Sequence, residues 1–170
     1  MEVQATAFDV ANAIVDRHGE TGYITNLKLN KLVYFAYAFF LRNGCKLFDD
    51  PIEAWPYGPV IPEVYHTYKN YGSSRVKTPA SHSYGQLAAQ AADVVWGLYG
   101  NLTAYDLVDL SHKEGSAWRA TPKYSQITDR AILSSVDAAP ESRIMDNTIA
   151  NSIGAGMERW GDALERLRNS

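Results

Sequence analysis

The stretch TNLKLNKLVYFAYAFFLRNG, residues 25–44, decides the fold. Beyond its first two turns it is apolar on nearly all sides, which in a soluble protein is typical of a central helix with neighbours on several faces. Thr25 or Asn26 can cap the start by accepting a hydrogen bond from a free backbone N–H. Gly44 suits the left-handed position that follows a helix end. We therefore expect a central helix over residues 26–43.

Further helices are predicted around this one from apolar residues at helical spacing and from capping residues. They cover residues 5–17, 62–71, 86–99, 103–115 and 127–136. Pro62 suits the first position of its helix. Thr103 and Thr128 can cap theirs, and Asp106 matches the capping box imperfectly because that motif prefers Glu or Gln.

A proline-rich segment, residues 46–62, follows the central helix. Three of its four prolines, Pro56, Pro59 and Pro62, lie within seven residues and exclude a continuing helix or a central strand. Short antiparallel pairing is expected between residues 46–48 and 52–55. The Asp-Asp-Pro sequence of residues 49–51 would supply the turn.

These elements predict a mainly α fold. We expect a single compact helical domain at residues 1–138, arranged around the helix at 26–43, with a small β-hairpin near 46–56. A C-terminal helical tail is expected at residues 139–170, packed on the domain or extending from it. Its glycines weaken that helix relative to alanine.

Composition bounds the function classes. The chain has 170 residues, a formal net charge of -3 and a pI near 5.8, so a large nucleic-acid footprint is not expected. One cysteine excludes an internal disulfide and a cysteine-cluster metal site. No metal or cofactor is expected. The N-terminus has no secretory pattern and the longest apolar stretch is about half of a bilayer span, so we expect a cytoplasmic protein without a membrane partner.

Aromatic residues are abundant, with 11 Tyr, 5 Phe and 4 Trp. Aromatics fill protein cores, and they are also preferred anchors at protein interfaces. Those at 34–40 lie on the central helix and are expected in the core. A second group surrounds the proline-rich turn and the helix after it, and partner binding is expected there if aromatics serve it: Trp55, Tyr57, Tyr65, Tyr68 and Tyr71.

Catalytic arrangements are weakly indicated. Cys45 with His66 or His112 could form a thiol–imidazole pair, although a merely buried cysteine is the simpler interpretation. The carboxylates of residues 49–53 could act with partners from elsewhere, or form a solvated turn. His112 near a predicted helix end also suits a role in stabilising the helix dipole.

Three segments have long, irregular sequences that helix periodicity and core packing do not explain. They are LKLNKLVYFAYAFFLRNG at 27–44, LFDDPIEAWPYGPVIPEVYHTYKNYG at 47–72 and LTAYDLVDLSHKEGSAWRAT at 102–121. Their spacing resembles the Panacea domain, also called the SocA-like antitoxin domain and formerly a phage-associated domain of unknown function. The resemblance covers roughly residues 5–135. One departure is Ala117, where the family often has proline.

The resemblance implies an α-helical antitoxin of a bacterial or phage toxin–antitoxin system. Such a protein neutralises a cognate protein toxin, encoded by an adjacent gene, through direct binding. A relative that delivers its toxin to a cytoplasmic protease implies an alternative role as a protease adaptor, with the tail as a second interaction surface. An uncharacterised enzyme is a third hypothesis. The candidate partner-binding residues are Trp55, Tyr57, Gly58, Pro59, Tyr65, Tyr68, His112 and Trp118, and no catalytic residue is assigned.

Overall fold

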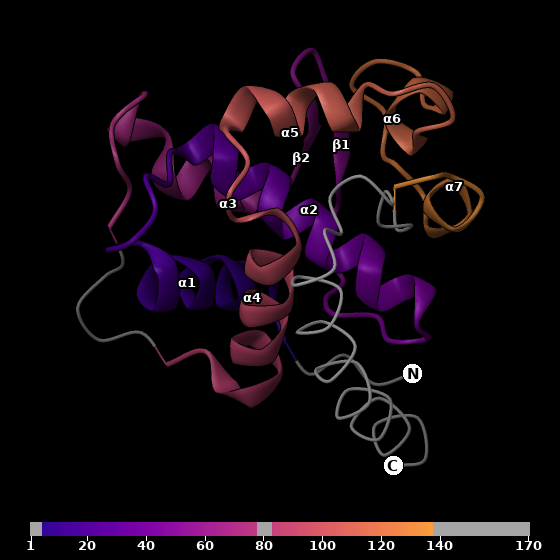
Figure 1. The fold of residues 1–170 in the computed structure, drawn as a ribbon. Coiled ribbons are helices and arrows are strands. Elements are labelled where there is room, and N and C mark those ends of the chain that lie inside the picture. Colours follow the sequence, from indigo (N-terminus) through magenta and orange to yellow (C-terminus); the bar gives the residue numbers. More distant parts are fainter. Residues whose placement is uncertain (1–4, 78–82, 138–170) are drawn as a thin grey trace.

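The computed structural model describes residues 5–77 and 83–137 (Figure 1). At its centre is helix α2, Asn26–Arg42, which contacts helices α1, α3, α4, α5 and α7 as well as strand β2. The Thr25 side chain caps α2 by accepting from the Lys28 N–H, and Gly44 adopts the left-handed conformation beyond its end. The predicted central helix is therefore confirmed.

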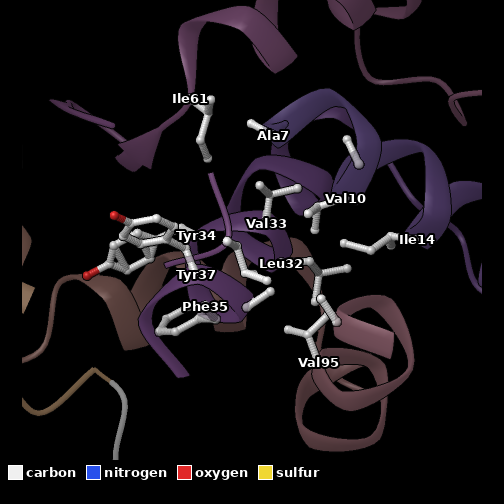
Figure 2. Packing of buried hydrophobic residues seen from close by; sticks show 14 of the residues in the cluster. Ala7, Val10, Ile14, Leu32, Val33, Tyr34, Phe35, Tyr37, Ile61 and Val95 are labelled. Carbon is white, nitrogen blue, oxygen red and sulfur yellow. The ribbon is translucent and has the colours of Figure 1, made fainter. Parts of the chain in front are cut away.

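Helices α1, Ala7–His18, and α4, Gly85–Tyr99, pack against each other and against α2 (Figure 1). Their apolar faces meet α2 in a continuous core that includes Val10, Ile14, Leu32 and Val95 (Figure 2). Thr6 and Asp9 form a capping box at the start of α1. Burial of these faces, which the apolar spacing predicted, is the main stabilising contribution to the fold.

The β-hairpin is present, but the predicted pairing is wrong. Strand β1, Glu53–Trp55, pairs antiparallel with β2, Gly58–Val60, so the hairpin turn is not at residues 49–51. The other edge of β1 is occupied by residues 124–127, through backbone hydrogen bonds between Ala54 and Ser125 and between Ala54 and Tyr124.

Residues 46–50 contact the core and the start of α1 instead of pairing with β1. Leu47 and Phe48 are fully buried in the core. The Asp50 carboxylate accepts the N–H of Ala7 at 2.9 Å, at the first residue of α1. Because these side chains bind elsewhere, the segment does not form a strand against β1.

Five short helical elements complete the described chain, namely α3, Pro62–Tyr68; a 3₁₀ turn, η1, Lys69–Tyr71; α5, Ala104–Ser111; α6, Ala117–Ala120; and α7, Asp129–Leu133. Pro62 starts α3 as predicted, and Thr128 caps α7. Asp106 completes a capping box with Thr103 despite its shorter side chain. The short α6 lies between the helices predicted at 103–115 and 127–136, where no helix was predicted.

Helix α7 and the segment after it are held against α2 by two tyrosines. The hydroxyls of Tyr34 and Tyr37 lie on the side of α2 away from α1 (Figure 2). Tyr34 donates to the buried Asp137 carboxylate, and Tyr37 donates to Asp129 at 2.6 Å. Ala117 donates its backbone N–H to Asp137 at 3.1 Å, a bond that proline could not make.

The described helices include none that is long and apolar enough to cross a membrane. The domain boundary near residue 138 and the helical tail expected at residues 139–170 lie outside the described residues.

Candidate functional site

The tip of the β1–β2 hairpin projects an exposed tyrosine. Residues Pro56 and Tyr57 form the turn, and 65% of Tyr57 is exposed. Gly58 follows with a φ of 107°, a conformation that side-chain-bearing residues rarely adopt. Figure 1 shows this hairpin beside α5. The rest of the site consists of the groups that hold this tip in place.

Behind the tip lies a fully buried lysine. Lys31, from the first half of α2, donates its Nζ to the carbonyl of Pro59 at 3.0 Å. A Cβ on Gly58 would come within 2.9 Å of the Lys31 Cε and would overlap the Ser111 hydroxyl. Burial lowers the pKa of Lys31 to about 7. Gly58 therefore allows α2 and α5 to approach the hairpin backbone closely.

Two asparagines of α2 fix the chain where it leaves the hairpin. The Asn30 Oδ1 accepts the N–H of Ile61 at 3.1 Å, and its Nδ2 donates to the Asn26 Oδ1 at 2.8 Å. Asn26 in turn donates to the Tyr65 carbonyl at 3.1 Å. When both the oxygen and the nitrogen of a buried side-chain amide form hydrogen bonds, the amide defines one geometry. Any shift of the bonded segments would leave a buried polar group unpaired.

The side of the hairpin is bound by an indole. Trp118, from α6, donates its Nε1 to the carbonyl of Trp55 at 2.6 Å. Its ring stacks on His112 with centroids 3.8 Å apart and planes 9° from parallel. His112 follows the end of α5, and its carbonyl accepts from Arg119. Burial, with the charge of Lys31 second, lowers the pKa of His112.

A cluster of rings covers the outer side of β1. The rings of Trp55 and Tyr65 meet edge to face with centroids 5.0 Å apart, and His66 contacts both. Trp55 is half-buried, whereas Tyr57, Tyr65 and His66 are exposed. We call these four residues the hairpin surface.

The structure brings seven of the eight candidate residues together and separates the eighth. Trp55, Tyr57, Gly58, Pro59, Tyr65, His112 and Trp118 belong to the hairpin or directly adjoin its supports. Tyr68 instead points into the core, where its hydroxyl donates to Asn12 at 3.1 Å and burial raises its pKa to about 12. A three-residue step drifts around a helix, which turns Tyr68 inward and leaves Tyr65 outside.

Sequence analysis missed the supports of the hairpin, namely Asn30, Lys31 and Ser111. A signal was present, because Asn30 and Lys31 interrupt the most apolar helix of the chain. Buried polar groups are retained where they have a specific partner. The partner, the backbone of β2, could not be identified from local sequence.

The groups considered for catalysis are dispersed. Cys45 is buried and its burial raises its pKa, which disfavours the reactive thiolate. Asp49 pairs with Lys46 at 3.7 Å, and a pocket beside it is lined by neither Cys45 nor a histidine. Within residues 5–77 and 83–137, no group of three or more His, Cys, Asp or Glu side chains could hold a metal ion.

Known proteins resemble this chain over the same segments. The family model described as "Antitoxin SocA-like, Panacea domain" matches residues 29–119, which run from within α2 through the hairpin, α3, α4 and α5 into α6. A curated relative, Antitoxin SocA of Caulobacter vibrioides, is 32% identical over 124 residues. That alignment covers 64% of this chain and 66% of the relative, just under two thirds of its length. No solved structure matches the chain.

The matched region includes most of the central helix, the hairpin and most of the groups that support it. Residues 29–119 contain Lys31, Gly58, Ser111 and Trp118 in one continuous match to the family model. The match covers more than half of the chain, so this protein belongs to the antitoxin SocA-like, Panacea domain family.

Proposed function

We propose that this protein is the antitoxin of a toxin–antitoxin pair and that it neutralises a protein toxin by binding it through the hairpin surface. Membership of the SocA-like family supports an antitoxin role. Binding without chemistry agrees with the pocket beside Asp49, whose lining in the described part of the chain includes neither Cys45 nor a histidine. The partner would be encoded by an adjacent gene, and both proteins would act in the cytoplasm.

The observation that carries this proposal is the rigid presentation of exposed aromatic side chains. Tyr57 stands on a turn whose backbone is fixed from behind by Lys31 and from the side by Trp118. A surface that is already ordered loses little conformational entropy on binding. Tyrosine and tryptophan contribute large contact areas with few torsions to fix.

Co-expression tests the proposal. The neighbouring reading frame is induced alone and together with the full-length chain, as wild type or as Tyr57→Ala. We expect the neighbour to arrest growth alone and the wild-type chain to restore it. Truncation of a central aromatic anchor costs about 2 kcal/mol, roughly thirtyfold in affinity, so Tyr57→Ala should fail to restore growth.

The matched control is Tyr105→Ala on α5, because 71% of Tyr105 is exposed and it lies outside the hairpin surface. That variant should neutralise like wild type. A non-toxic neighbour, or equal neutralisation by both variants, would refute the proposal. Toxin lifetime in the same cells separates direct occlusion, which leaves it unchanged or longer, from a protease adaptor, which shortens it.

A further inference from the structure

The hairpin and α3 carry an excess of negative charge. Residues 47–68 contain four carboxylates and no lysine or arginine. Asp49 and Asp50 are engaged elsewhere, with Lys46 and with the start of α1. The other two, Glu53 and Glu63, flank the hairpin surface. The charge of this face is therefore set by two carboxylates and the exposed rings between them.

Glu53 and Glu63 are close to the rings and are not neutralised. The Trp55 Nε1 donates to the Glu53 Oε1 at 3.4 Å. Glu63 lies three residues before His66 on α3, so the two side chains share a face of the helix. Within the described part of the chain, neither carboxylate forms a salt bridge. The nearest cations in sequence, Lys46 and Lys69, lie outside residues 47–68, and Lys46 pairs with Asp49 and Asp129.

Rings and carboxylates together recognise one chemical group well. A guanidinium is attracted to the face of Trp or Tyr and stacks on it as a planar group. The same guanidinium donates several hydrogen bonds in a fork that matches a carboxylate. Trp118 fixes the backbone carbonyl of Trp55, and Tyr65 and Glu53 contact the Trp55 ring, so the ring is positioned before any partner arrives.

We infer that the hairpin surface binds an arginine-bearing segment of the partner protein, with the guanidinium stacked on Trp55, Tyr57 or Tyr65 and paired with Glu53 or Glu63. This inference rests on the proposed function, because it names the chemistry of the partner that the antitoxin would hold. Complementary charge would also speed the encounter and make it sensitive to salt.

Peptide titration of the full-length protein, followed by nuclear magnetic resonance, tests the chemistry without the toxin. The probes are one short alanine peptide containing several arginines and the same peptide with each arginine replaced by citrulline, its neutral isostere. We expect the arginine peptide to shift the Trp55 indole N–H and the Tyr57 amide with a dissociation constant in the range of about 1 mM. The citrulline peptide should bind about threefold or more weakly.

Matched double variants test the two carboxylates. Glu53→Gln with Glu63→Gln should weaken binding of the arginine peptide by about threefold or more, as loss of the charged partner predicts. Glu20→Gln with Glu114→Gln removes the same charge from exposed positions elsewhere and should leave the affinity unchanged. Circular dichroism of each variant establishes that the fold is retained.

Three results would overturn the inference: equal binding of the citrulline peptide, no shift of the Trp55 or Tyr57 signals, or equal loss of affinity in both double variants. The co-expression assay distinguishes a failure of the arginine inference from a failure of the proposed antitoxin function. If Tyr57→Ala loses neutralisation while Glu53→Gln with Glu63→Gln retains it, the antitoxin role stands and the arginine chemistry is wrong.

Discussion

Both halves of α2 are mostly buried, but their buried side chains differ in chemistry. Residues 26–31 bury two asparagines and two lysines, whose side chains reach backbone or amide groups of other segments. Residues 32–42 bury tyrosines, phenylalanines and aliphatic side chains in the core. Side chains of the first half bond to the hairpin, to α3 and to the end of α4, whereas those of the second half lie mainly in the apolar core.

This difference separates stability from positioning. Apolar burial stabilises the fold in proportion to area and tolerates some rearrangement. Buried hydrogen bonds contribute less net free energy, but an unmade bond is costly, so they select a single geometry. We conclude that the second half of α2 holds the fold together, while the first half sets the position of the hairpin surface.

Phe40→Ala should cause the largest loss of stability. Phe40 is fully buried in the second half of α2, and its removal leaves a cavity, so the free energy of unfolding should fall by about 3–5 kcal/mol. Urea denaturation measures the change. Leu133→Ala removes a 47%-exposed side chain from α7 and should alter stability by less than about 0.5 kcal/mol. Similar losses in both variants would contradict the assignment of stability to the second half of α2.

Gly58→Ala should lower the free energy of unfolding by about 2–4 kcal/mol, because it combines a left-handed φ with overlap against Ser111 and Lys31. Thermal denaturation by calorimetry measures it. The control is Gly97→Ala, on an open face of α4, which should stabilise the protein by about 1 kcal/mol through helix propensity. If Gly58→Ala left the free energy of unfolding unchanged, the hairpin backbone would not be in close contact with α2.

Asn30→Ala should cost about 1–3 kcal/mol, since it leaves the buried N–H of Ile61 without an acceptor. The diagnostic measurement is amide hydrogen exchange. Protection should fall at Ile61 and along α3 while the amides of α1 and α4 keep wild-type protection. Uniform loss across all helices would contradict a local positioning role for the first half of α2.

Lys31 should make stability depend on pH. Its pKa is about 7 in the folded protein and near its ordinary value of 10.5 when unfolded, so the unfolded chain holds more protons between these values. Stability attributable to Lys31 therefore rises with pH above 7, by up to about 1.4 kcal/mol per pH unit. Denaturation of wild type and Lys31→Met from pH 7 to 9 tests this, and parallel curves would refute it.

Local signals predicted much of the fold. Thr25, Thr103 and Thr128 cap the helices expected of them, and Pro62 starts α3. The apolar residues of the central helix are in the core as expected. Each of these signals acts within about one turn of the chain, so the neighbouring sequence is sufficient to define it.

The hairpin shows where local signals stop. Three residues near 46–48 and three near 58–60 were both available to pair with β1, and the turn chemistry of Asp-Asp-Pro favoured the wrong choice. The choice followed from Leu47 and Phe48 entering the core and from Asp50 binding the start of α1. Those partners lie far away in sequence, and only the assembled core brings them close.

The sequence by itself determined the central helix, the helix starts at capping threonines and at Pro62, and the family resemblance carried by three segments. The tertiary structure alone decided which strand pairs with β1, that Tyr68 turns inward while Tyr57 and Tyr65 stay exposed, and that Lys31 and Asn30 support the hairpin. The physical reason is the separation along the chain over which each kind of interaction acts. Capping and turn preferences act between neighbours in the chain, whereas burial and hydrogen-bond satisfaction depend on groups that meet only when the chain has folded.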